Sequence, residues 1–393
     1  MSLSLFIAAL CLSSLARASQ PASHPMHARA DQVVSPKVFI ISMFLPEAEI
    51  WYGIPEFDIL AQNITVPGIS PIYPQVYCTA DNEVCQVITG EAEINAASTI
   101  SSLSQSPLFD LRKTYFLIAG IAGISPKVGT LGSVTFARFA VSVALQYEID
   151  AREKPQDWKT GYFPEGTSSP NDYSNILYGT EVFEVNDALR QLAVSFAQNA
   201  TLNDTAKAQS YRALYASTPA YTTHGSKPPS IVACDTTTSD VYFSGTLLAE
   251  AFENTVSLFT NGSGIYCSTQ QEDNATLEAL LRAANIKLVD FSRIIIMRTA
   301  SNFDRPHANQ TALNNLRVVS GQGFLPAVEN IYFAGIKVVQ GILNGWESQF
   351  EAGIKTTNYV GDIFGTLGGQ PDFGPVIVPV DAPATYAKKN TTK

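Results

Sequence analysis

The chain has 393 residues, of which 46% are hydrophobic and only 15% are charged, so it can bury the core of one large domain or of two ordinary ones. Its formal net charge of -10 makes nucleic acid and anionic membranes poor partners, because an acidic surface repels both. A small or neutral ligand is more compatible with this composition.

The first residues have the pattern of a secretory signal peptide. An apolar run from Leu3 to Leu15 precedes Ala16-Arg17-Ala18, a small-x-small sequence that predicts cleavage after Ala18. A short membrane anchor is the alternative, but the run is shorter than the ~20 residues that span a bilayer. We therefore expect residues 1–18 to be removed and the mature chain to be extracellular or at the cell surface.

The rest of the chain predicts one folded domain between two flexible ends. Residues 19–36 are polar and without periodicity, which is typical of a flexible extension, and residues 376–393 are interpreted as a flexible tail. Residues 37–375 are predicted to form a single domain. They contain no uninterrupted apolar run of about 18 residues, so no membrane-spanning helix is expected.

Apolar runs typical of buried strands alternate with helical patterns along this domain. The expected strands are 37–43, 84–89, 115–120, two segments near Ile231 and Ile265, and 292–298. The expected helices begin near Pro46 and Ile94 and span 186–197, 275–284 and 325–350. This alternation predicts a three-layer α/β fold with a central mixed, mostly parallel twisted sheet flanked by helices, and ligands at the carboxyl ends of its strands.

The segment 152–183 is rich in Pro, Gly and aromatic residues, and it is expected to form a long excursion over the ligand site or a plain surface loop. Cys78 and Cys85 flank a turn sequence, TADNEV, which predicts a disulfide within a hairpin. Cys234 and Cys267 lie at strand ends and either pair or remain buried thiols.

Seven N-x-Ser/Thr sequons predict glycosylation if the chain is secreted. The expected glycan sites are Asn63, Asn199, Asn203, Asn261 and Asn309, and the remaining sequons begin at Asn274 and Asn390.

Five segments resemble, in order, the motifs of the purine nucleoside phosphorylase and nucleosidase superfamily: KVFIISMFLPEAEIW, VITGEAEINAAS, FLIAGIAGISPKVGTLGSVTFA, STQQEDNATLEAL and IIIMRTASNFD. The stretch LQYEIDARE-x-P-x-x-W-x-x-GYFP at residues 145–164 narrows the resemblance to the fungal-type purine nucleoside permease family, over roughly residues 37–370. The resemblance implies a nucleoside-phosphorylase-like fold. It also implies purine nucleosides, such as inosine, guanosine or adenosine, as ligands.

The resemblance also assigns ligand contacts. The implied ligand-binding residues are Gly120, Ile121, Ala122 and Gly123 in a glycine turn, Tyr242 and Phe243 for base stacking, and Gln271, Glu272 and Ser301. A carboxylate such as Glu272 can accept hydrogen bonds from both ribose hydroxyls. Without a ligand, the same glutamate would simply favour the start of a helix through the helix dipole. Of Tyr242 and Phe243, one is expected to pack in the core.

The implied catalytic positions are Glu47, Asn302 and Asp304. Glu47 corresponds to the acid that positions the attacking water in nucleosidases, although Glu49 is a rival in the same motif and a solvated helix-start glutamate is the plain alternative. Asn302 falls where those enzymes carry an aspartate that protonates the purine. An amide cannot supply that proton, but it can donate to a ring nitrogen and accept from a purine N–H, as in the oxopurine-specific branch. Asp304 would supply acidity if it turned inward.

Related phosphorylases hold phosphate with an arginine and a serine around the glycine turn, whereas this sequence has Ile118 and Ile121. An apolar pair cannot neutralise a phosphate dianion, which argues against phosphorolysis. The scattered histidines form no metal-ligand pattern, and neither a metal nor another cofactor is expected.

Two functions remain open at this stage. One is an extracellular purine-nucleoside-binding protein that supports nucleoside uptake, with a membrane transporter as a partner. The other is a secreted purine nucleoside ribohydrolase that cleaves the N-glycosidic bond with water. The oligomeric state is not determined by the sequence.

Overall fold

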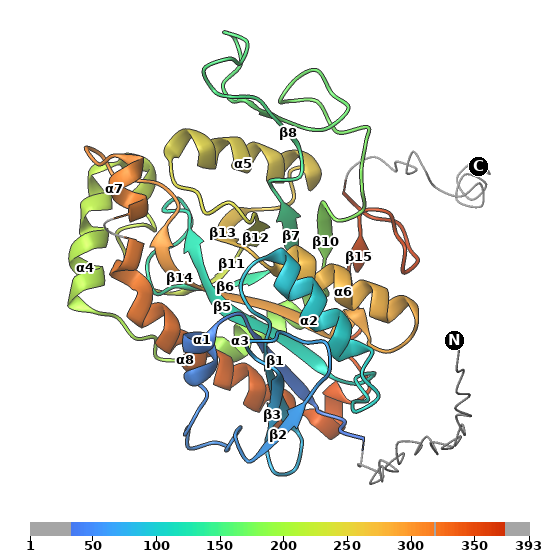
Figure 1. Ribbon diagram of the computed structural model, residues 1–393. Coiled ribbons are helices and arrows are strands. Elements are labelled where there is room, and N and C mark those ends of the chain that lie inside the picture. Colours follow the sequence, from blue (N-terminus) through green and yellow to red (C-terminus); the bar gives the residue numbers. More distant parts are fainter. Residues whose placement is uncertain (1–32, 318–319, 374–393) are drawn as a thin grey trace, which may run out of the picture. The chain divides into compact units, whose positions relative to one another are not determined.

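Strands and helices alternate along residues 33–317 and 320–373, the part of the chain described by this computed structural model (Figure 1). The strands are β1 (Val38–Ser42), β2 (Gln62–Thr65), β3 (Gln75–Cys78), β4 (Val84–Ile88), β5 (Tyr115–Ile124), β6 (Val134–Ala137), β7 (Phe139–Ser142), β8 (Tyr147–Glu148), β9 (Tyr162–Phe163), β10 (Val182–Glu184), β11 (Ile231–Ala233), β12 (Asp235–Thr238), β13 (Tyr266–Gln270), β14 (Ile294–Phe303) and β15 (Gly361–Asp362). The helices are α1 (Leu45–Glu49), α2 (Glu93–Ser104), α3 (Asp187–Ala197), α4 (Ala206–Arg212), α5 (Thr246–Phe259), α6 (Asp273–Asn285), α7 (Ala312–Arg317) and α8 (Phe324–Asn344).

All strands except β8 and β9 belong to one mixed sheet. Its main path is β15-β10-β7-β12-β13-β5-β1-β4-β3-β2, and β14, β6 and β11 branch from β5. At the centre, β4, β1, β5 and β14 are parallel, whereas the strands at both ends of the path pair antiparallel. The central strands are fully or almost fully buried, as the uninterrupted apolar run of β1 predicts.

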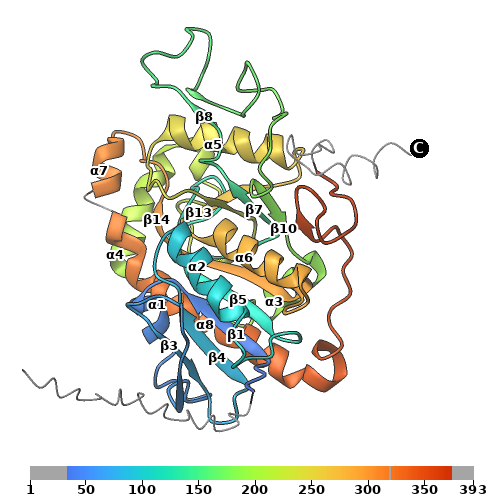
Figure 2. The same ribbon diagram turned by 45° about the vertical axis from the view of Figure 1, so that its right-hand side comes forward.

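Helices cover both faces of this sheet, which gives the three layers visible in Figures 1 and 2. Side chains of β1 alternate between two apolar cores: Phe39 and Ile41 pack with α2 and α6, whereas Val38 and Ile40 pack with α3 and α8. The expected α/β class with a mixed central sheet is therefore confirmed.

The segment predicted to be a glycine turn is part of a strand. β5 continues through Gly120 and Gly123 to Ile124, and it stays paired with β14 along this length. The chain turns only after Ser125, whose N–H donates to the carbonyl of Cys267 at 2.9 Å. The prediction was wrong because the backbone pairing of β14 holds these glycines extended, which no local sequence signal reveals.

The long excursion between β7 and β10 packs mainly against α5. Its short hairpin of β8 and β9 places Tyr162 on Phe252, with ring centroids 5.0 Å apart, and Tyr173 contacts Phe259. No residue between 152 and 183 lines the principal cavity described below, so the expectation that this segment covers the site is not met.

The predicted disulfide between Cys78 and Cys85 is present, in the hairpin of β3 and β4. Cys234 and Cys267 also form a disulfide, which answers the alternative left open above. Both join segments inside the core, where all four cysteines are buried.

The structure separates the sequons by exposure. Asn63, Asn199, Asn261 and Asn309 are exposed, and Asn203 is half-buried. Asn274 is buried in α6, and its Nδ2 donates to the carbonyl of Thr180 at 2.7 Å, so it cannot carry a glycan in this fold. Asn390 lies outside the described residues.

The predicted signal peptide and the predicted C-terminal tail lie outside the described residues, as does most of the extension. Residues 33–36 at the end of that extension already belong to the domain, because the Val34 N–H donates to the Leu108 carbonyl at 2.9 Å. Within the described ranges, no helix is both long and apolar enough to cross a bilayer.

Candidate functional site

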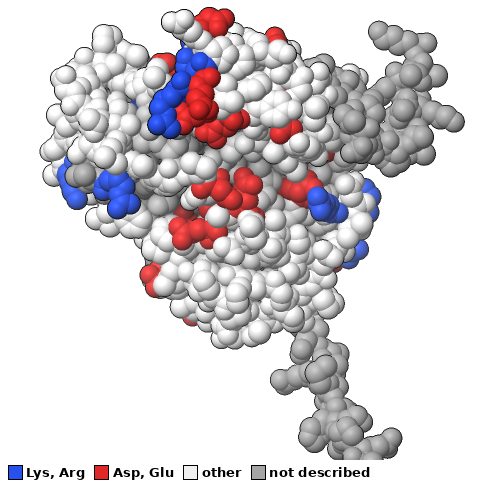
Figure 3. All heavy atoms as spheres, turned by 45° about the horizontal axis from the view of Figure 1, so that its top comes forward, with Lys and Arg blue, Asp and Glu red and all other residues white. Residues whose placement is uncertain are grey.

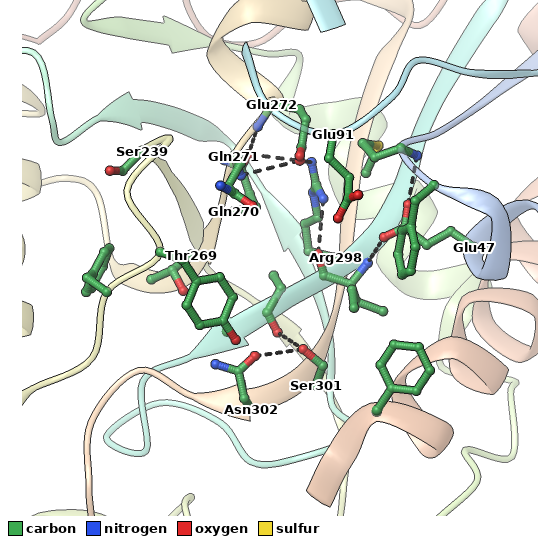
Figure 4. Close-up of a pocket in the computed structure, with 18 of the residues that line it drawn as sticks. Glu47, Glu91, Ser239, Thr269, Gln270, Gln271, Glu272, Arg298, Ser301 and Asn302 are labelled. Atoms are coloured by element: carbon green, nitrogen blue, oxygen red, sulfur yellow. Dashed lines mark hydrogen bonds and ion pairs between the residues drawn. The ribbon is translucent and has the colours of Figure 1, made fainter. Parts of the chain in front are cut away.

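A cavity of about 240 Å³ opens where the central strands end. Its walls come from the β1–α1 connection and α1, the loop after β4, the carboxyl-terminal part of β5, the loop after β12, the end of β13, the second half of β14 and the start of α8. Because parallel strands end at a common edge, side chains far apart in the sequence meet at this place (Figure 4).

Glu47 is buried in the cavity wall, on α1. Its Oε2 accepts the N–H of Met43 at 2.8 Å and its Oε1 accepts the N–H of Ile121 at 2.7 Å (Figure 4). Burial raises the pKa of Glu47 to about 8, although the positive charge of Arg298 opposes that rise. Glu49 is exposed and does not line the cavity, so Glu47 is the glutamate of this motif that borders it.

The glycines of β5 provide the space that the cavity side chains occupy. A Cβ atom on Gly120 would lie 2.6 Å from Oε1 of Glu47, and one on Gly123 would clash with the Thr269 hydroxyl. Gly120 itself does not line the cavity, whereas Ile121, Ala122 and Gly123 do. The glycines therefore admit neighbouring side chains as well as bringing main chain to the cavity.

Arg298 is a functional candidate that the sequence reasoning missed. It lies buried in the cavity wall, where its Nη2 contacts Asp273 Oδ1 at 2.6 Å. The same Nη2 lies 3.1 Å from Glu272 Oε2, and Nη1 donates to the Ile121 carbonyl at 3.1 Å (Figure 4). A buried cation needs such partners, because desolvation without them is very costly. The signal was an arginine within the apolar strand sequence IIIMRTA.

Glu272 is held in place by protein donors. It is the N-cap residue of α6, its Oε1 accepts the N–H of Ala92 at 3.0 Å, and its Oε2 pairs with Arg298. Ala92 has a φ of 75°, a strained conformation for a residue with a side chain. Burial raises the pKa of Glu272, while Arg298 opposes that rise. Oε2 also accepts the N–H of Gln271 at 3.3 Å, so the acceptor capacity left for a ligand hydroxyl is the second lone pair of Oε1.

Ser301 and Asn302 reach the cavity through an irregularity in β14. The register with β5 shifts between Ala300 and Asn302, and such bulges redirect side chains. The Ser301 hydroxyl lies 2.8 Å from Oδ1 of Asn302 and can donate to it (Figure 4). The same hydroxyl also lies 3.1 Å from the Ala122 carbonyl. The amide NH₂ of Asn302 can donate to a ligand, and its Oδ1 keeps a second lone pair that can accept.

The two aromatic residues after β12 have different surroundings. Phe243 packs on Phe252 with ring centroids 4.7 Å apart, whereas Tyr242 is 53% exposed at the cavity mouth. Tyr242 is thus the ring that is free to stack on a ligand. Gln271 also lines the cavity, and its Nε2 donates to the Asp240 carbonyl at 2.8 Å.

Two residues singled out from the sequence lie away from the cavity. Asp304 is fully engaged: its Oδ1 accepts from Nε of Arg305 at 2.8 Å and its Oδ2 accepts the Tyr266 hydroxyl at 2.8 Å, so it does not turn inward. Ile118 is buried in the sheet between Ile41 and Ile296. Of the isoleucine pair, only Ile121 lines the cavity.

The cavity is acidic. Glu47, Glu91 and Glu272 line it, and Arg298 is the basic residue among its lining side chains. Figure 3 shows acidic side chains gathered near the centre of one face of the molecule. Among residues 33–317 and 320–373, no group of three or more His, Cys, Asp or Glu side chains is placed to hold a metal ion.

The structure defines an α/β protein with a cavity at the carboxyl ends of its central strands. The purine nucleoside permease family model matches residues 35–355, and the chain belongs to this family. A purine nucleoside permease of Candida albicans is 47% identical over 348 residues, which cover 87% of this chain and 84% of that protein. A probable purine nucleoside permease of Schizosaccharomyces pombe is 42% identical over 80% of this chain and 91% of its own length.

Two solved structures with some similarity are a nucleosidase and a hydrolase. The 5′-methylthioadenosine/S-adenosylhomocysteine nucleosidase of Neisseria meningitidis is 13% identical, with a TM-score of 0.45, 78% of this chain covered and 99% of that chain covered. The futalosine hydrolase of Helicobacter pylori is 14% identical, with a TM-score of 0.44 and coverages of 79% and 98%.

Proposed function

We propose that this chain binds purine nucleosides in the cavity and supports their uptake. The observation that carries the proposal is the convergence of Glu272, Asn302 and Tyr242 on one cavity. These residues offer an acceptor for ribose hydroxyls, a donor for a purine ring nitrogen and an aromatic face for the base. The names of the relatives point to the same ligand class.

The charges around the cavity favour a neutral ligand over inorganic phosphate. Arg298 is already paired with two carboxylates, Glu272 and Asp273, and it is therefore not available to neutralise a further anion. Ile118 lies outside the cavity and has no bearing on phosphate binding there, whereas Ile121 lines it.

We propose that the protein acts outside the cell or at its surface. Two disulfides and four exposed sequons support this location, because disulfides persist in oxidising compartments. A membrane transporter would then carry the nucleoside across the bilayer.

A second candidate function is phosphate-independent hydrolysis of the nucleoside. The observation that favours it is Glu47, a buried acid at the cavity wall whose pKa is raised to about 8 by burial. An acid with a pKa near the working pH can exchange a proton with water or substrate. Asn302, which cannot protonate the base, favours binding alone.

The test is to incubate the purified full-length protein with inosine, guanosine and adenosine, with and without phosphate. Calorimetry measures binding, and chromatography detects free base, ribose and ribose 1-phosphate. The binding proposal predicts saturable binding of at least one nucleoside without cleavage, and hydrolysis predicts free base and ribose at a rate unaffected by phosphate. Absence of any nucleoside binding would refute the proposal, and ribose 1-phosphate would refute the argument from charge.

A further inference from the structure

Glu91 is an acidic residue of the cavity that none of the roles above uses. It follows Gly90 after β4, and Gly90 has a φ of +84° that turns the chain toward the cavity mouth. In Figure 4 the Glu91 side chain projects into the cavity between Glu272 and Glu47. Within the described ranges its carboxylate has no hydrogen-bond or ion-pair partner, so its acceptor capacity is free.

The neighbourhood of Glu91 adds negative charge and no free cation. Arg298 is held by Glu272 and Asp273. On the rim, the Glu93 N–H donates to Asp240 Oδ1 at 2.9 Å, which holds the Asp240 carboxylate beside this segment. Glu93 itself adds less charge, because burial and the Asp240 charge raise its pKa to about 7 and it is partly neutral near that pH. Glu91 is exposed at the cavity mouth, so an anionic group that entered beside it would be repelled by its carboxylate and would find Arg298, the basic residue of the lining, already paired.

We infer that Glu91 selects nucleosides with a free 5′-hydroxyl and excludes their 5′-phosphates. The inference rests on the proposed nucleoside binding: with the base at Asn302 and the ribose 2′ and 3′ hydroxyls at Glu272, the 5′ carbon is the part of the sugar left to face Glu91. A carboxylate accepts a hydroxyl donor and repels a phosphate monoester. Glu91 is therefore a specificity-determining residue.

If the protein excludes 5′-phosphates, an earlier reaction must supply the free nucleoside that it binds. Purine nucleotides would have to lose their phosphate by hydrolysis of the phosphate monoester before the base and sugar can bind here. The protein would then take up the product of that hydrolysis and leave nucleotides in solution.

The experiment compares inosine, 5′-deoxyinosine and inosine 5′-monophosphate by calorimetry at low ionic strength, where charge effects are least screened. The variants are Glu91→Gln, which removes the negative charge of Glu91 at the cavity, and Glu49→Gln, which removes one negative charge at an exposed position of α1. We expect the native protein to bind the monophosphate at least about a hundredfold more weakly than inosine, and 5′-deoxyinosine about tenfold more weakly. Glu91→Gln should reduce the ratio of the affinity for inosine to the affinity for the monophosphate by about tenfold, and Glu49→Gln should leave this ratio unchanged.

The outcomes separate this inference from the function on which it rests. If no nucleoside binds the native protein, the proposed function fails. If inosine binds but the monophosphate binds within threefold of it, or if both variants alter the ratio equally, the role of Glu91 is refuted while nucleoside binding stands.

Discussion

Two buried arginines near the end of β14 have similar partners and different surroundings. Arg298 pairs with Glu272 and Asp273 in the cavity wall, whereas Arg305, just beyond the strand, pairs with the buried Asp304 and the half-buried Glu253. Both clusters place one guanidinium against two carboxylates.

Arg298 and Glu272 of the first cluster line the cavity described above, and no member of the second cluster lines that cavity. In the second, both carboxylate oxygens of Asp304 already accept hydrogen bonds from Tyr266 and Arg305. Buried charges therefore indicate a ligand site only where space and unused acceptors remain beside them.

The largest expected effect concerns the cluster of Arg305, Asp304 and Glu253, which does not line the cavity. Asp304→Ala leaves Arg305 buried without its main partner, and breaking such a pair costs about 3–5 kcal/mol of unfolding free energy. Urea denaturation measures this loss, and nucleoside affinity of the folded fraction should change less than about twofold, which is under 0.5 kcal/mol. Glu351→Gln, which removes an exposed ion pair with Lys113, is the control and should leave the midpoint unchanged. A selective loss of nucleoside binding in Asp304→Ala would place that cluster in the site.

The next effect concerns Glu47, which lines the cavity together with Arg298 and Glu272. Its folded pKa of about 8 exceeds its ordinary value of 4.5, so the native state binds the proton more tightly than the unfolded state. The contribution of Glu47 to the free energy of unfolding is therefore fully present below pH 4.5. It decreases as the pH rises to about 8, by an amount on the order of a few kcal/mol. Urea midpoints at pH 5 and pH 8 should differ less in Glu47→Gln than in the native protein. An equal pH dependence in both would show that Glu47 does not retain a proton in the folded state.

A smaller effect tests whether Glu272, which pairs with Arg298 in the cavity wall, contacts the ligand. Glu272→Gln removes the charge that would accept ribose hydroxyls, and hydrogen bonds to charged groups contribute about 1.5–3 kcal/mol. Nucleoside affinity should fall about tenfold or more, since about 1.4 kcal/mol corresponds to a factor of ten. Some stability should be lost as well, because Glu272 also pairs with Arg298. Glu278→Gln, which changes a glutamate of the same helix that pairs with Arg282, should not alter affinity. Unchanged binding in Glu272→Gln would exclude it as a ribose contact.

The smallest effect concerns Asn302, which lies on β14 between the two arginines. Asn302→Asp replaces an amide donor by an acid and should shift preference from inosine and guanosine toward adenosine, by about tenfold or 1.4 kcal/mol in relative affinity. Calorimetry with the three nucleosides measures the ratio. Asn309→Asp, at an exposed position, is the control. The same base preference in Asn302→Asp and the native protein would contradict a base contact.

Much of the fold follows from the sequence alone. The apolar runs of β1, β4 and β14 and the helical patterns of α2, α3 and α6 are local signals, because burial on a sheet and amphipathic spacing leave a direct imprint on residue order. The hairpin disulfide between Cys78 and Cys85 is equally local. The family motifs also identified Glu47, Glu272 and Asn302, which the structure brings to one cavity.

Only the tertiary structure decided which residues share that cavity and which are closed off. Asp304 and Asn302 are two residues apart in the same motif, yet one is engaged in the core and the other borders open space. Arg298 and Glu91 were missed because an arginine in an apolar strand and a glutamate in a loop acquire their meaning from distant partners. Cavities and ion pairs are formed by contacts between strands far apart in the chain, and such contacts leave no periodic trace in the residue order.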